Sequence, residues 1–167
     1  TYTGKQIKPT TVTATYEGKT LTFDKDFTLS YGENINAGTA KGTVTLTSVS
    51  NDFSGSKTIT FDIAQRDIAE ASATASSGPF FYTGSQITPK VAATYNGLNL
   101  AETTDYALTY GENINVATGG TITLTGAGNY TGTKVISFAI SKRYLTDAAV
   151  TAAVKAGTYT YTGSQIT

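Results

Sequence analysis

The chain of 167 residues contains neither cysteine nor histidine. Without cysteine, disulfide bonds and thiolate metal sites cannot hold the fold together. Without histidine, the chain lacks the most common general base and metal ligand. It also has no Gly-x-Ser-x-Gly motif around a serine nucleophile and no glycine-rich phosphate-binding signature. We therefore expect that the chain is not an enzyme and has no catalytic residue, cofactor or metal site.

Charge is also scarce. Charged residues make up 14% of the chain, compared with about 25% in an ordinary soluble domain. The 12 basic residues balance the 12 acidic ones, and no long run of either sign occurs. This balance argues against nucleic acid or an anionic membrane as a partner. No apolar run approaches the roughly 18 residues of a membrane span, so we expect no membrane insertion in this chain.

What the sequence does contain is a repeat. The heptad YTGSQIT occurs at 82–88 and again at 161–167, and a near copy, YTGKQIK, occurs at 2–8. The similarity continues in two longer blocks: DFTLSYGENIN at 26–36 matches DYALTYGENIN at 105–115, and KTITFDI at 57–63 matches KVISFAI at 134–140. The chain is therefore a tandem array with one module in about 80 residues.

The repeated blocks have the periodicity of β-strands. Phe27, Leu29 and Tyr31 alternate with Thr28 and Ser30. This period of two directs one row of side chains toward a core and the Thr-rich row toward water. Asn-Gly between two apolar runs is a strong signal for a tight hairpin, and it occurs at 96–97. Several short strands within about 80 residues predict an all-β fold of small two-sheet sandwiches.

The boundary between modules has two interpretations. A polar break at 65–67 precedes an Ala-rich stretch at 68–75, and the same order recurs at 142–152. We interpret the break as a linker and the Ala-rich stretch as the first strand of the following module. The expected domains are then 1–64, without a first strand of its own, 65–142, which is complete, and 143–167, which opens a third repeat in a longer protein. Alternatively, each Ala-rich stretch closes the preceding sandwich.

Few carboxylates recur in both repeats. Glu33 matches Glu112 and Asp26 matches Asp105, but a module this small has little room for the cleft that an acid pair needs. A calcium site at Asp24, Asp26 and Glu33 is not supported, because Asp24 becomes Thr103 in the second repeat. We interpret these carboxylates as solvated loop residues.

Lys57 and Lys134 share strand parity with the apolar rows that follow them. An inward lysine needs a partner, and surface sandwiches sometimes join such a lysine covalently to an asparagine side chain. The candidate asparagines are Asn34, Asn36, Asn113 and Asn115. We favour the alternative that each lysine reaches out to water at the strand end.

The YGENIN segments also have a structural and a functional interpretation. The glycine and asparagine residues are suited to hold a turn after the strand, and this is the interpretation that we favour. Loops on rigid sandwiches also carry recognition, so the segments are candidate exposed contact loops. The candidate contact residues are Tyr31, Glu33, Asn34, Asn36, Tyr110, Glu112, Asn113 and Asn115.

Together the motifs resemble a known family of repeats. They are Y-T-G-x-Q-I-x-P at 2–9 and 82–89, D-[FY]-x-L-x-Y at 26–31 and 105–110, N-A-G-T at 36–39, and G-N-Y-T-G at 128–132 followed by F-A-I at 138–140. This pattern is similar to the tandem immunoglobulin-like repeats of Gram-positive surface proteins, and most similar to the cell- and mucus-binding adhesins of lactobacilli. The segment N-V-A-T-G-G at 115–120 departs from the N-A-G-T form, so this loop is expected to differ between modules.

The resemblance implies immunoglobulin-like β-sandwiches in a secreted, extracellular protein anchored to the bacterial cell wall. It implies attachment to host mucin glycoproteins or epithelial glycans as the first expected function, through weak contacts multiplied over many copies. The alternative is a passive stalk that projects a separate binding domain. We expect a monomer.

Overall fold

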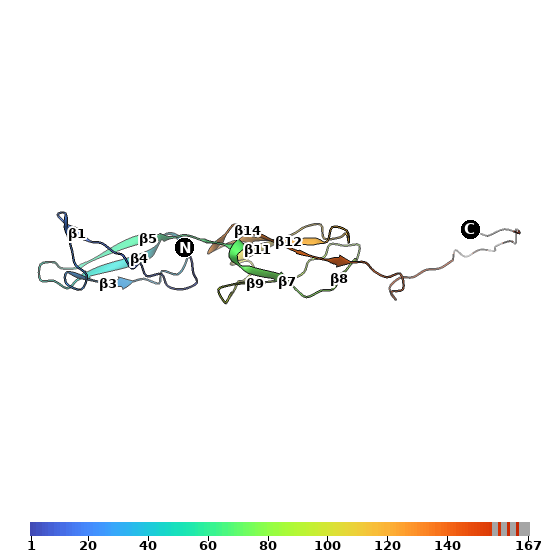
Figure 1. Cartoon of the computed structure of the whole chain (residues 1–167), viewed down its shortest axis with the longest axis horizontal. Coiled ribbons are helices and arrows are strands. Elements are labelled where there is room, and N and C mark those ends of the chain that lie inside the picture. Colours follow the sequence, from blue (N-terminus) through green and yellow to red (C-terminus); the bar gives the residue numbers. More distant parts are fainter. Residues whose placement is uncertain (155–156, 158–159, 161–162, 164–167) are drawn as a thin grey trace.

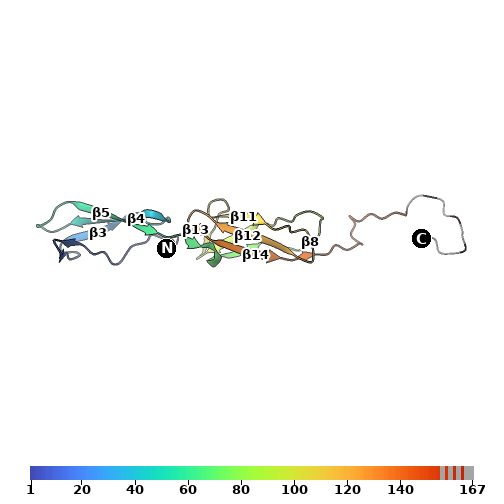
Figure 2. The same ribbon diagram turned by 90° about the horizontal axis from the view of Figure 1, so that it is seen from above.

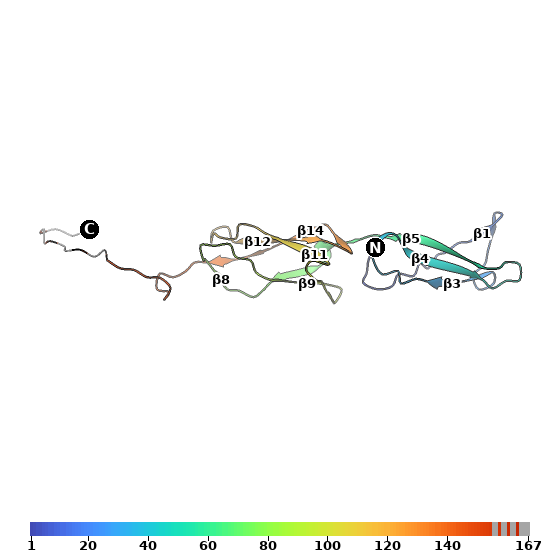
Figure 3. The ribbon, with the colours of Figure 1, turned by 180° about the vertical axis from the view of Figure 1, so that it is seen from behind.

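The computed structural model describes residues 1–154, 157, 160 and 163. The chain is all-β, as predicted, and its described residues include one short 3₁₀ helix. Two β-rich units follow one another along the long axis of the molecule (Figure 1). The views from above and from behind show the same extended arrangement (Figures 2 and 3). We call the two units the first repeat and the second repeat.

The first repeat contains a hairpin and a three-stranded sheet. Its strands are β1 (Thr15–Tyr16), β2 (Lys19–Thr20), β3 (Phe27–Tyr31), β4 (Gly38–Ser48) and β5 (Ser56–Ile63). The strands β1 and β2 pair with each other, and the order in the sheet is β3-β4-β5, antiparallel throughout.

The second repeat contains two three-stranded sheets and two short parallel pairs. Its elements are β6 (Arg66–Asp67), η1 (Ile68–Glu70), β7 (Ser72–Ala75), β8 (Phe80–Phe81), β9 (Val91–Tyr95), β10 (Leu98–Asn99), β11 (Tyr106–Tyr110), β12 (Gly120–Gly126), β13 (Tyr130–Thr131), β14 (Thr133–Phe138) and β15 (Ile140–Ser141). The sheets have the orders β10-β9-β7 and β11-β12-β14, and the parallel pairs join β13 to β6 and β15 to β8.

The apolar residues of the alternating pattern point into the core, as the sequence predicts. In the second repeat Ile122 and Leu124 of β12 are fully buried, while Thr121 and Thr125 on either side are exposed and Thr123 between them is half-buried. The two sheets face each other, because residues of β9 and β12 belong to one buried apolar cluster. Burial of such a row contributes about 25 cal/mol for each Å² of apolar surface.

The Asn-Gly signal also has the expected result. Asn96 and Gly97 have positive φ angles of 47° and 79° and connect β9 to β10. Two successive positive φ angles are the mark of a type I′ turn, which matches the twist of the strands on either side.

The Ala-rich stretch lies in the sheet of the repeat that follows it. The strand β7 pairs with β9, with Ser72 opposite Thr94 and Ala75 opposite Val91. This stretch differs from the prediction at its start, where residues Ile68–Glu70 form a 3₁₀ turn instead of a strand. The side chain of Asp67 accepts a hydrogen bond from the backbone nitrogen of Ala69 at 2.9 Å and so caps the turn.

The polar break before this stretch is more ordered than a linker. Arg66 and Asp67 form β6, which pairs with β13 of the second repeat. Of the opening motif expected for a third repeat, residues 161–167 lie outside the described residues except for Gly163. No helix among the described residues is long and apolar enough to cross a membrane.

Candidate functional site

The YGENIN loop of the first repeat is organised around a buried asparagine. Asn34 has a positive φ of 47° and is only 4% exposed. Its Oδ1 accepts a hydrogen bond from the backbone nitrogen of Thr43 at 2.7 Å. Its Nδ2 donates to the carbonyl oxygens of Ile7, at 3.1 Å, and Thr43, at 2.9 Å. The side chain thus joins the repeated opening motif to strand β4.

Asn113 holds the second repeat in the same way. Its Oδ1 accepts from the nitrogen of Thr121 at 2.8 Å, and its Nδ2 donates to the carbonyl oxygens of Ile87 and Thr121 at 3.1 and 3.0 Å. Asn34 and Asn113 therefore do not belong among exposed contact residues, because all their amide hydrogen-bonding groups are engaged inside the repeat. Tyr31 and Tyr110 are half-buried, and each hydroxyl donates to a proline carbonyl, that of Pro9 or Pro89, at 3.0 Å.

Glu33, Asn36, Glu112 and Asn115 are the exposed members of the predicted contact set. Among them, Asn36 has a partner far away in the sequence. Its Oδ1 accepts a hydrogen bond from Nδ2 of Asn129 at 3.1 Å. This contact places the end of the first YGENIN segment at the joint between the repeats.

The two lysines reach different environments. The ammonium group of Lys134 donates to the carbonyl oxygen of Ala69 at 2.9 Å, whereas Lys57 is exposed. The structure does not bring Lys134 and Asn113 together as a bonded pair, since the Asn113 amide is held by Ile87 and Thr121.

The recurring aspartates cap loops. Oδ2 of Asp26 accepts from the nitrogen of Thr22 at 2.7 Å, and Oδ2 of Asp105 accepts from the nitrogen of Ala101 at 2.8 Å. Among the described residues no three histidine, cysteine, aspartate or glutamate side chains are grouped closely enough to hold a metal ion.

The joint between the repeats has an aromatic centre. The rings of Tyr2 and Tyr130 meet edge to face with centroids 5.4 Å apart, and Tyr95 adds a second edge contact with Tyr130 at 6.1 Å. The hydroxyl of Tyr130 is buried and has no hydrogen-bond partner among the described residues. Burial raises the pKa of Tyr130 to about 12, and the nearby Tyr2 and Asp105 add to this rise.

Polar contacts surround this centre. Oδ1 of Asn129 accepts from the backbone nitrogen of Ala37 at 2.8 Å. Nε2 of Gln65 donates to the carbonyl oxygens of Gly128 and Tyr130 at 2.8 and 3.1 Å. In addition, Arg66 donates from Nε to the carbonyl oxygen of Tyr2 at 3.3 Å. The joint therefore combines a buried aromatic contact with directional hydrogen bonds, which together oppose free rotation between the repeats.

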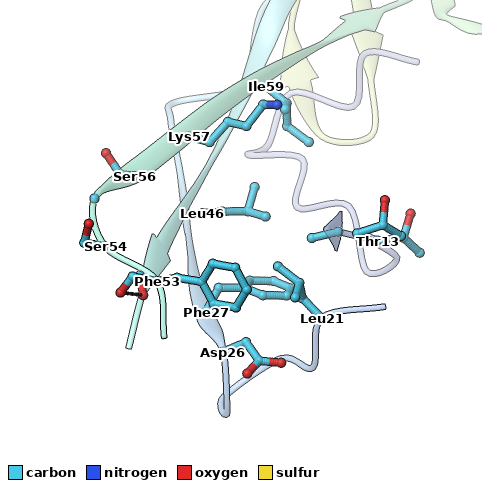
Figure 4. A pocket seen from close by; sticks show the side chains of 14 residues that line it. Thr13, Leu21, Asp26, Phe27, Leu46, Phe53, Ser54, Ser56, Lys57 and Ile59 are labelled. Atoms are coloured by element: carbon cyan, nitrogen blue, oxygen red, sulfur yellow. Dashed lines mark hydrogen bonds between the residues drawn. The ribbon is translucent and has the colours of Figure 1, made fainter. Parts of the chain in front are cut away.

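The first repeat also has an open groove lined by both polar and apolar side chains (Figure 4). It encloses about 410 Å³ between the segment around Thr13 and the strands β4 and β5. Leu46, Phe27 and Ile59 line it, and Figure 4 shows their side chains directed into it. A second hollow of about 250 Å³ continues it past Thr13 toward Pro9. We call the two hollows together the first-repeat groove.

The corresponding space in the second repeat is filled by the chain itself. Ile68 of η1 is 0% exposed and Ala71 is 2% exposed. By the repeat alignment, Leu124 and Ile136 correspond to Leu46 and Ile59. Leu124 is fully buried whereas Leu46 is half-buried, and Ile136 is half-buried whereas Ile59 is 37% exposed. In the second repeat, η1 and β7 lie against the strands that carry Leu124 and Ile136.

Comparison of the chain with family models, with curated proteins and with solved structures finds no match in any of the three. Its function must therefore be inferred from the geometry of the joint and of the first-repeat groove. Sequence reasoning missed Asn129, Gln65 and Arg66 as joint residues. No local signal marks them, because their partners lie far away along the chain.

Proposed function

We propose that the chain is part of the repeat region of a bacterial surface adhesin and that its repeats act as a stalk. The observation that supports this proposal is the ordered joint. A rigid spacer must keep a fixed angle between neighbouring modules, and this requires contacts that restrict bending at the joint. The contact between Tyr2 and Tyr130 and the hydrogen bonds of Asn129 supply such a restriction.

The shape of the described chain suits the same role. The repeats follow one another along the long axis, and β4 and β12 run roughly along it (Figure 1). Strands that lie along a rod add about 3.3 Å of length for each residue, so a small number of residues spans a long distance. The resemblance to adhesins of lactobacilli supports a position on the bacterial surface.

The stalk proposal is tested by measuring length against copy number. Chains with one, two and four copies of the residues 65–142 would be compared by small-angle X-ray scattering. A stalk requires the maximum dimension to grow in proportion to the number of copies. If the maximum dimension grew only with the square root of the number of copies, as for a flexible linker, this result would contradict the stalk proposal.

A second candidate function is direct attachment to mucin glycans or epithelial surfaces. It is supported by the Thr-rich outer rows, where Thr45 and Thr58 pair their hydroxyl groups at 2.8 Å on an exposed, nearly uncharged face. Such a face suits weak contacts that gain strength from many copies. In this case the same copy-number series should adhere to immobilised mucin with rising strength. Adherence of the parent protein without adherence of any member of the series would leave the stalk as the function.

A further inference from the structure

The chain passes through the second repeat from one end to the other. It enters at β6, which pairs with β13 beside the joint, and it leaves at β15, which pairs with β8 at the far end (Figure 2). We propose that the second repeat bears tension along its long axis, because a pull on the chain loads these two parallel strand pairs in shear. The proposal rests on the stalk function and adds to it resistance to unfolding under force.

The directions of the paired strands decide how a pull acts on them. We call residues 66–82 the entry segment and residues 129–141 the exit segment. Both segments run in the same direction, because each of the pairs β6-β13 and β8-β15 is parallel. A pull along the axis draws the start of the entry segment toward the first repeat and the end of the exit segment away from it. The two segments must then slide past each other, so the evenly spaced hydrogen bonds of the parallel pairs are loaded together.

Hydrogen bonds connect the two segments at the end beside the joint. The backbone nitrogen of Arg66 donates to the carbonyl oxygen of Asn129 at 2.9 Å. The ammonium group of Lys134 donates to the carbonyl oxygen of Ala69, also at 2.9 Å. The second contact continues the connection beyond the short pair of β6 and β13, because it joins η1 to β14.

The far end has its own connections. The backbone nitrogen of Tyr82 donates to the carbonyl oxygen of Ser141 at 2.9 Å, which extends the pair of β8 and β15 by one residue. The rings of Phe80 and Phe138 meet edge to face with centroids 5.0 Å apart. The entry and exit segments are thus joined at both ends, and a sliding movement strains both groups of contacts at once.

Sliding also draws apolar side chains out of the core. Ile68 and Ala71 of the entry segment are 0% and 2% exposed, and Tyr130 and Ile140 of the exit segment are 1% and 3% exposed. The segments are held in different sheets, since β7 pairs with β9 and β14 pairs with β12. Movement along the axis must therefore break hydrogen bonds and expose buried apolar surface in the same step, which raises the barrier to unfolding.

The direction of pulling tests the proposal in the full chain. Since the chain has no cysteine, two introduced cysteines can carry the handles of an optical trap. Ala64→Cys with Lys142→Cys pulls along the axis and loads the second repeat. Thr83→Cys with Lys142→Cys is the matched control, because both handles then lie just after the ends of β8 and β15 and separate that pair one hydrogen bond at a time. All three positions are exposed.

Unfolding under force is governed by the rate of unfolding and not by equilibrium stability. At the same loading rate, the unfolding force along the axis should be at least about twice the force in the control direction, because the axial pull loads all connections together. Equal forces in the two directions, or a lower force along the axis, would overturn the proposal. The comparison does not depend on a destabilising substitution, since each cysteine replaces an exposed side chain.

A lysine substitution tests the load path itself. Lys134→Met keeps the apolar stem but removes the hydrogen bond to Ala69, so it should lower the axial force. The force in the control direction should not change, because that pull begins at the opposite end of the repeat. Lys90→Met removes the same charge from an exposed position of the same repeat and should change neither force. An equal loss for both variants, or an equal loss in both directions for Lys134→Met, would contradict the path through Lys134.

Failure of this proposal differs from failure of the stalk function. Equal forces in the two directions, together with a maximum dimension that grows in proportion to the number of copies, would remove the tension-bearing role and keep the stalk. A maximum dimension that grows with the square root of the number of copies would remove the stalk function and, with it, the role proposed for these strand pairs.

Discussion

Tyr2 and Tyr130 pack edge to face across the joint, with their ring planes at 76°. Tyr2 belongs to the opening motif of the first repeat, and Tyr130 belongs to the G-N-Y-T-G motif of the second. Tyr82, the counterpart of Tyr2, is 42% exposed, whereas Tyr2 is 9% exposed. Tyr130 of the second repeat therefore contributes to the burial of Tyr2.

Asn129→Ala should loosen the joint without unfolding either repeat. It removes the hydrogen bonds to Ala37 and Asn36, and the freed groups lie near solvent, so the loss of stability should be only about 1 kcal/mol. Small-angle scattering should show a broader distribution of maximum dimensions. Asp52→Ala, at the matching position of the first repeat, serves as the control and should leave the distribution unchanged. An unchanged distribution for Asn129→Ala would show that the aromatic contact and the hydrogen bonds of Gln65 and Arg66 set the angle without Asn129.

Asn113→Ala should destabilise the second repeat by about 3 kcal/mol, because it removes three hydrogen bonds, each with a net contribution of about 0.5–1.5 kcal/mol. Alanine at the positive φ of 50° adds strain. Asn113→Gly should recover about 1 kcal/mol by relieving that strain alone. Urea denaturation measures both changes. Asn115→Ala is the exposed control, expected within about 0.5 kcal/mol of the unsubstituted chain, and an equal effect of the two alanine variants would refute the buried role.

Leu124→Ala and Leu46→Ala compare matched positions in the two repeats. Leu124 is fully buried, and its truncation should cost about 2–5 kcal/mol. Leu46 lies beside the open first-repeat groove and is half-buried, so its truncation enlarges an existing hollow and should cost only about 1 kcal/mol, near the centre of the range for point substitutions in general. Differential scanning calorimetry should show the larger decrease for Leu124→Ala. The reverse order would mean that the groove is closed in solution.

Stability should fall between pH 10 and pH 12 because of Tyr130. Its folded-state pKa is about 12, above the ordinary value of about 10 that applies in the unfolded chain. In this interval the unfolded chain loses the phenol proton first, so rising pH favours unfolding. Tyr130→Phe removes this contribution and also the unpartnered hydroxyl, so it should be neutral or stabilising at pH 7.

The measurement is the difference in the free energy of unfolding between the two chains at pH 7 and at pH 11. The unsubstituted chain should lose more stability than Tyr130→Phe, although burial also raises the pKa of Tyr106 and Tyr110 and these contribute in both chains. Parallel pH curves for the two chains would contradict the role of Tyr130.

Local periodicity predicted the all-β fold, and the Asn-Gly pair predicted the hairpin at Asn96 and Gly97. In each case the physical cause is local: side chains alternate along a strand, and positive φ is tolerated by glycine and asparagine. The same periodicity was not sufficient for Ile68–Glu70, where the cap by Asp67 forms a 3₁₀ turn before β7 begins. The prediction that Asn34 and Asn113 are exposed was also wrong. Both side chains are buried, because backbone groups distant in the sequence satisfy their hydrogen bonds.

The repeat itself and the alternation within it were determined by the sequence alone, since both depend only on residue order. The tertiary structure decided which surfaces the repeats present. Folding brings Tyr130 to Tyr2, Asn129 to Ala37, and Gln65 to β13 at the joint. No pattern along the chain indicates such distant neighbours. The first-repeat groove likewise forms only in the folded chain, because Leu46 and Ile59 line it together with Thr13, which is distant from them in the sequence. Burial is a property of neighbours in space, and neighbours in space are set only when the whole chain has folded.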